Sequence, residues 1–69
     1  MVDSTTTDLI PQELDYRISD GLEVSLLWSK SGNRLTVAVH DTATGELLEI
    51  PARPENALDV FRHPYAYAA

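Results

Sequence analysis

Apolar and polar residues alternate along the middle of the chain, and the run over residues 22–29 is the clearest case. Alternation at period two is typical of a strand that buries one of its faces. We therefore predict a central strand here, with one neighbouring strand on each side. The apolar residues of this strand occupy the even positions Leu22, Val24, Leu26 and Trp28.

Three further segments alternate in the same way, and glycine-containing turn sequences separate them. Asp-Gly and Ser-Gly-Asn sequences between alternating segments are strong turn signals, and short turns join antiparallel strands. The pattern predicts a four-stranded antiparallel meander in chain order. The predicted strands span about 14–19, 22–29, 34–41 and 46–52.

Side-chain parity predicts the pairing, because directly opposite residues share one face of a sheet. At the first turn, a three-residue loop would place Ile18 opposite Leu22 and gather the apolar residues of both strands on one face. A two-residue loop would place Ile18 opposite Glu23 and separate them. We expect the three-residue loop, and a single long strand kinked at Gly21 is the alternative.

The two later turns require even loop lengths, and they predict Trp28 opposite Leu35 and Val39 opposite Leu48. These registers also predict a polar row across the outer face of the sheet. A metal site needs three or four converging ligands, and the row offers only Glu23 and His40, so we expect solvent-exposed side chains without a metal. The predicted row consists of Arg17, Glu23, His40 and Leu47.

A helix is predicted over about 54–62, because Pro54 suits a first helical turn and apolar residues follow on one stripe. Pro64 should end it. The expected architecture is an α+β fold, a single ββββα domain over 13–69, in which the helix covers one face of the sheet. Residues 1–12 are rich in Thr, Asp and Ser, and we expect a disordered N-terminal tail.

Composition narrows the function further. A chain of 69 residues has room for one domain with a small core. It has no Cys and carries a formal net charge of −6. A small domain without disulfides favours a cytoplasmic location, and the negative charge opposes binding to nucleic acid or to anionic membrane surfaces. No signal peptide or membrane-spanning run is apparent.

No nucleophile elbow, phosphate loop or paired-histidine motif occurs, so the sequence favours a non-enzymatic protein without a cofactor. We expect a small protein-interaction module, a regulator or adaptor that binds a protein partner or a second copy of itself. The alternative is a small-molecule-binding or enzymatic domain with a pocket between helix and sheet. The candidate interaction residues are Trp28, Leu27, Leu47, His63, Tyr65 and Tyr67.

Each of these residues also has a purely structural interpretation. Trp28 stands at an inward strand position and is expected in the core, whereas single outward Leu residues such as Leu27 and Leu47 are common on any protein surface. His63 at a helix C-terminus can simply interact with the helix dipole. Tyr65 and Tyr67 are expected to pack an extended tail onto the helix or the sheet edge.

Several segments together resemble short, acidic, uncharacterised actinobacterial proteins. The resemblance covers about residues 16–69, and its most specific part is the closing His-Pro-Tyr-Ala-Tyr-Ala element. It implies a bacterial cytoplasmic setting and no particular activity. The segments are Leu26-Leu27-Trp28, Val37-Ala38-Val39, Asp41-Thr42-Ala43-Thr44-Gly45-Glu46, Ala57-Leu58-Asp59-Val60-Phe61 and His63-Pro64-Tyr65-Ala66-Tyr67-Ala68.

Overall fold

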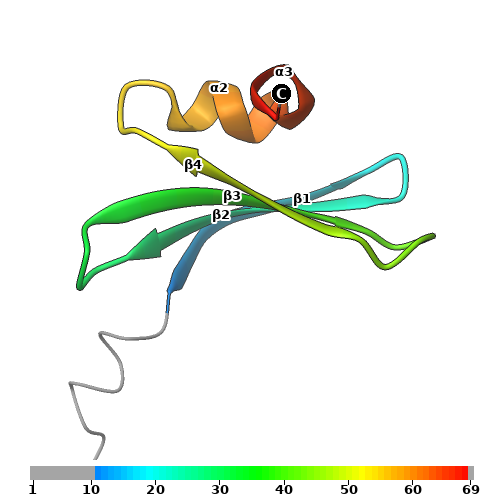
Figure 1. Cartoon of the computed structure of the whole chain (residues 1–69), viewed down its shortest axis with the longest axis horizontal. Helices are drawn as coiled ribbons and strands as arrows, with labels where there is room; N and C mark the ends of the chain where they lie inside the picture. Colours follow the sequence, from blue (N-terminus) through cyan, green and yellow to red (C-terminus); the bar gives the residue numbers. More distant parts are fainter. Residues whose placement is uncertain (1–10, 69) are drawn as a thin grey trace, which may run out of the picture.

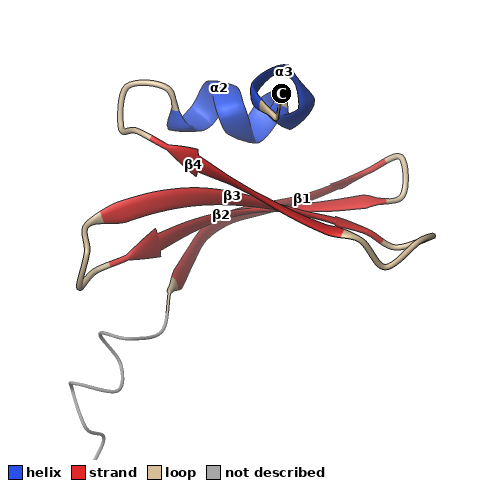
Figure 2. Cartoon of the chain, in the orientation of Figure 1, coloured by secondary structure: helices blue, strands red, loops and turns tan. Residues whose placement is uncertain are grey.

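A computed structural model describes residues 11–68, and in it four strands form one antiparallel sheet in chain order, as predicted. Two short helices follow, and Figure 1 shows both of them on the same side of the twisted sheet. The strands and helices account for most of the described chain (Figure 2). The elements are β1 (Gln12–Ser19), β2 (Leu22–Ser29), β3 (Arg34–Asp41), β4 (Leu47–Ala52), α2 (Ala57–Arg62) and α3 (Pro64–Tyr67).

The α+β meander and two of its three strand registers are confirmed. Trp28 lies opposite Leu35 between β2 and β3, and Val39 lies opposite Leu48 between β3 and β4. The strand boundaries agree closely, although β1 begins at Gln12 rather than at residue 14. The predicted disordered tail over 1–12 falls, apart from its last two residues, outside the described part of the chain.

The register predicted for β1 is wrong. Ser19 lies opposite Leu22 and Ile18 opposite Glu23, so Asp20 and Gly21 form a two-residue turn. Both turn residues have positive φ, 52° and 78°. A two-residue hairpin turn with positive φ at both positions matches the twist of the flanking strands, and Asp-Gly is a favoured sequence for it. The local turn preference therefore outweighs the burial of β1's apolar residues, and the alternative of one continuous strand is wrong as well.

This register turns β1 over relative to the prediction. Tyr16 and Ile18 lie on the outer face, where they are 42% and 67% exposed. Arg17 instead lies on the inner face, opposite Val24. Leu14 stands in an irregular step of the pairing between Glu13 and Asp15, and it is also exposed. The edge strand β1 consequently adds no apolar side chain to the buried core.

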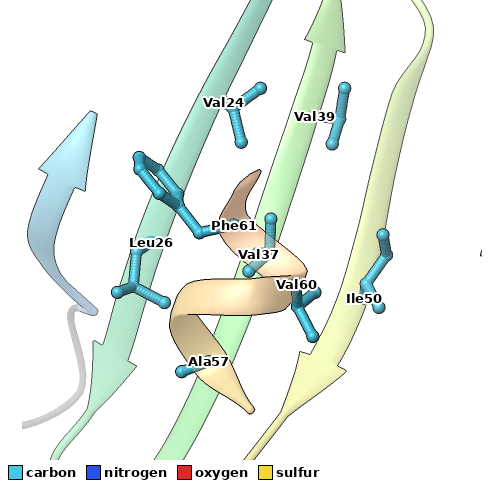
Figure 3. Close-up of a cluster of buried hydrophobic side chains, with 8 residues drawn as sticks. All are labelled: Val24, Leu26, Val37, Val39, Ile50, Ala57, Val60 and Phe61. Atoms are coloured by element: carbon cyan, nitrogen blue, oxygen red, sulfur yellow. The ribbon is translucent and has the colours of Figure 1, made fainter. Parts of the chain in front are cut away.

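The core lies between α2 and the three strands β2, β3 and β4. Figure 3 shows three residues of α2 packed over five strand residues, and β1 lies beside the cluster. Burial of apolar surface is the main favourable term in folding, so this cluster holds α2 on the sheet. Its members are Val24, Leu26, Val37, Val39, Ile50, Ala57, Val60 and Phe61.

Trp28 was predicted to belong to this core, but it is only partly buried and lies outside the cluster. It stands near the end of β2, and its indole Nε1–H donates a hydrogen bond to Asn33 Oδ1 in the next turn, at 3.1 Å. This hydrogen bond is exposed to solvent, which fits a position at the edge of the packed region. Trp28 therefore closes one end of the sheet instead of filling its centre.

The helix begins at Ala57, three residues later than predicted. The preceding turn is closed by Asn56, whose Oδ1 accepts a hydrogen bond from the backbone N–H of Arg53 at 2.8 Å. Asn side chains commonly compete with helix for backbone partners in this way. The helix ends at Arg62, and Pro64 then opens α3 at its first position, where a missing N–H costs nothing. The extended tail expected after Pro64 is therefore helical as far as Tyr67.

Within residues 11–68, neither helix is long and apolar enough to cross a membrane.

Candidate functional site

The helices cover only one face of the sheet, and the opposite face, called the outer face below, has no element over it among the described residues (Figure 1). The registers place its side chains in three rows that run across the strands. The first row is Ile18, Glu23, His40 and Leu47; the second is Tyr16, Ser25, Ala38 and Glu49; the third is Glu13, Leu27, Thr36 and Pro51.

Large apolar side chains stand on both edge strands of the outer face. Ile18 and Tyr16 come from β1, and Leu47, which is 63% exposed, comes from β4. In the second row the central strands carry the small residues Ser25 and Ala38 between Tyr16 and Glu49, whereas Glu23 and His40 fill the centre of the first row.

A hydrogen-bonded chain of three polar side chains crosses the outer face. The Tyr16 hydroxyl donates to Glu23 Oε2 at 2.9 Å. The other carboxylate oxygen, Oε1, lies 2.8 Å from His40 Nδ1. Because an ionised carboxylate can only accept, the proton of the neutral imidazole belongs on Nδ1 and leaves Nε2 as an acceptor.

These contacts shift two pKa values. The hydrogen bonds from His40 and then Tyr16 hold the pKa of Glu23 below its ordinary value. The hydrogen bond to Glu23 raises the pKa of the Tyr16 phenol, because ionisation would place two negative charges side by side. Glu23 is therefore ionised and oriented at neutral pH.

The predicted polar row is correct in three of its four positions. Glu23, His40 and Leu47 are neighbours on the outer face, but Ile18 occupies the place expected for Arg17. Among the described residues, no group of three or more His, Asp or Glu side chains comes together to hold a metal ion.

The inner side of the sheet carries a different feature, a pocket of about 410 Å³ between the β1–β2 turn and the junction of α2 and α3. Arg17 reaches into this region from β1. Its Nε–H and Nη2–H groups donate to the carbonyl oxygen of Phe61 at 3.2 and 2.8 Å, and Nη2 also donates to the carbonyl of Arg62 at 3.0 Å. The guanidinium carbon lies 5.4 Å from the centre of the Phe61 ring. Arg17 thus caps the C-terminal end of α2, where free carbonyls attract a cation.

Four of the six candidate interaction residues predicted from the sequence lie at these two places. Leu27 and Leu47 lie on the outer face. His63 and Tyr65 line the inner pocket. Trp28 belongs to neither, and Tyr67 lies outside the pocket lining, where its hydroxyl donates a hydrogen bond to Asp59.

Sequence reasoning missed Tyr16 and Ile18 on the outer face and Arg17 in the pocket. One signal could have found all three. The preference of Asp20-Gly21 for a two-residue turn, taken at face value, turns β1 over and moves each of them to the observed face.

No family model, curated protein sequence or solved structure matches this chain. The resemblance to short acidic actinobacterial proteins therefore stays a prediction.

Proposed function

We propose that this protein is a small, non-enzymatic interaction module that binds a protein partner through the outer face of its sheet. The observation that carries the proposal is the exposure of Tyr16, Ile18 and Leu47 on a face that no described element covers. Exposed apolar side chains gathered on one surface and separated by polar groups are typical of interaction sites. A role as a regulator or adaptor in the cytoplasm agrees with a chain that lacks Cys.

The charge of the outer face indicates the chemistry of the partner. Glu13, Glu23 and Glu49 stand among the apolar side chains, and Arg34 lies apart at the start of β3. The whole chain carries a formal net charge of −6. Complementary charge steers association and opposes wrong partners, so the proposed partner presents an apolar patch surrounded by Lys and Arg.

The same charge argues against a second copy of this chain as the occupant. Two outer faces packed together would bring acidic residues close to acidic residues. The outer face of the sheet is also small. Three strand spacings of ~4.8 Å and seven residue steps of ~3.3 Å enclose roughly 300 Å². A stable interface buries about 800 Å² on each partner. The proposed interaction is therefore transient and aided by charge.

Affinity capture with three matched variants tests this proposal. The double variant Ile18→Ser, Leu47→Ser removes apolar contacts from the outer face, and both sites are exposed enough for the fold to tolerate the change. Leu58→Ser is the control, because Leu58 is 56% exposed on α2 instead. We expect a partner that the wild type and the control capture, that the double variant loses, and that rising salt releases.

Two results would count against the proposal. A partner captured equally well by the double variant would bind elsewhere on the molecule. Sedimentation equilibrium that shows a dimer of the wild type and a monomer of the double variant would assign the outer face to a second copy.

A further inference from the structure

We propose that the pocket between the β1–β2 turn and the α2–α3 junction binds a small oxyanion, a carboxylate or a phosphate, carried on a short apolar body. The pocket lies on the side of the sheet that the helices cover, because its wall residues Arg17 and Leu22 point inward. It is therefore separate from the outer face, and the inference does not rest on the proposed protein-binding function.

Two arginines line this pocket. Arg17 and Arg62 stand there beside the imidazole of His63, although the chain has only five Lys and Arg residues against eleven Asp and Glu. Asp20 is the acidic residue of the lining. Two arginines against one carboxylate give the pocket a local excess of positive charge, which favours an anion in an otherwise acidic protein.

Arg17 is held in one orientation and still has donors to offer. Its Nε and Nη2 groups are committed to the carbonyls of Phe61 and Arg62, and its guanidinium stacks over the Phe61 ring. A guanidinium has five N–H donors, and within residues 11–68 its Nη1 group makes no hydrogen bond of its own. A planar guanidinium fixed in this way is prepared to donate to a carboxylate or phosphate oxygen.

Arg62 and His63 supply the adaptable part of the site. Both are exposed and adjacent at the junction of the helices, and neither side chain makes a hydrogen bond or ion pair with the described residues. Neither side chain is therefore committed to another group of the described chain. Arg17, held by α2, and these two exposed side chains beside it would contact an oxyanion together.

Apart from Ser19, the remaining residues of the pocket wall are mainly apolar, and they select the body to which the oxyanion is attached. Leu22 comes from β2, and Pro64, Tyr65 and Ala66 come from α3. The volume of about 410 Å³ falls in the range of small-molecule sites, roughly 300–1,000 Å³. A ring or short aliphatic chain would lie against these side chains while its charged end faces the arginines.

Asp20 opposes an anion, and its presence has a structural explanation. It occupies the two-residue turn with φ of 52°, a conformation that Asp and Asn adopt more readily than most other residues. Asp20→Asn keeps the turn and removes the negative charge. This variant therefore changes the electrostatics of the pocket and leaves its shape intact.

Amide chemical shifts of the ¹⁵N-labelled full chain, titrated with phenyl phosphate or with benzoate at constant ionic strength, test the inference. We expect saturable shifts confined to residues 17–22 and to Arg62, His63, Tyr65 and Ala66 around the pocket lining. Arg62→Gln should weaken binding about tenfold, the loss expected for one charge-assisted hydrogen bond. Asp20→Asn should tighten binding several-fold, and Arg53→Gln, which removes an arginine that does not line the pocket, should leave the affinity unchanged.

The two ligands distinguish a phosphate site from a carboxylate site, and saturable binding of either one at these residues supports the inference. Absence of saturable shifts with both, or an affinity that Arg62→Gln does not change, would overturn it. The Ile18→Ser, Leu47→Ser double variant should bind these anions like the wild type. Failure of the anion site is therefore distinguishable from failure of the outer-face interaction.

Discussion

Replacing Arg17 by Met tests the most consequential contact that the structure reveals. Met keeps an apolar stem of similar length, but it removes every N–H group that now satisfies the carbonyls of Phe61 and Arg62. It also removes the cation over the Phe61 ring. The carbonyl oxygens at the C-terminal end of α2 would then have to accept hydrogen bonds from water instead.

The expected loss follows from these contacts. A hydrogen bond to a charged group contributes about 1.5–3 kcal/mol when buried. Arg17 is only partly buried, so solvent reduces this figure, and we expect a loss of about 1–2 kcal/mol. A chain of 69 residues has a total stability of roughly 3–10 kcal/mol, so the change is a large fraction of what holds the domain together.

Urea unfolding followed by far-ultraviolet circular dichroism and by the fluorescence of Trp28 measures this loss. With a denaturant slope of about 1 kcal/mol/M for a small domain, the midpoint should fall by about 1–2 M. Hydrogen exchange should also accelerate at the amides of α2, because its C-terminal end frays first.

Arg53→Met is the matched control. Arg53 is exposed, and its side chain makes no hydrogen bond to a residue that the structure describes. It should change the free energy of unfolding by no more than about 0.5 kcal/mol. Equal urea midpoints for the Arg17 and Arg53 variants would refute the view that Arg17 anchors α2 to the edge strand.

Three further predictions follow from individual contacts. Phe61→Ala should cost about 3–5 kcal/mol because Phe61 is a buried core residue, and a native-like urea midpoint would contradict the packing of α2. The pKa of Glu23 is lowered, so the contribution of its carboxylate to stability is complete above the ordinary pKa of 4.5 and is lost as pH falls through the lowered pKa. The difference in urea midpoint between wild type and Glu23→Gln should therefore shrink on acidification. A difference that stays constant with pH would contradict this contribution. The hydrogen bond to Asp59 raises the pKa of Tyr67, so this bond's contribution to stability is present below the ordinary pKa of 10.0 and is lost as pH rises through the raised pKa. Asp59→Asn should lower the pKa of Tyr67 in an ultraviolet titration. An unchanged pKa would show that the contact is absent in solution.

The outward position of Leu27 and Leu47 was predictable, because it depends on the registers of β2, β3 and β4. The two exposed residues of β1 that complete the outer face were not, since their predicted face was the opposite one. The alternative prediction of a pocket between helix and sheet placed it near Trp28, His63 and the tyrosines, but of these residues only His63 and Tyr65 line it. Its cationic character depends on Arg17, whose predicted face was the outer one.

The strands β2, β3 and β4, their order and their pairing could be predicted from the amino-acid pattern alone. Their apolar residues recur strictly at period two, and a slip by one residue would move every one of them from the core into water. Burial, turn length and alternation all favour the same arrangement there, so counting positions was sufficient.

Alternation alone could not predict the face of β1 or the conformation of the chain after Pro64. In β1, burial of the apolar residues and the geometry of the Asp20-Gly21 turn favour opposite registers, and the folded chain has the register that the turn favours. The same register brings Arg17 to acceptors on α2, 44 residues further along the chain at Phe61. Beyond Pro64, the short helix α3 is joined to α2 through the Tyr67–Asp59 hydrogen bond. Contacts between segments this far apart, or between helices this short, do not produce a repeating pattern of apolar residues from which they could be predicted.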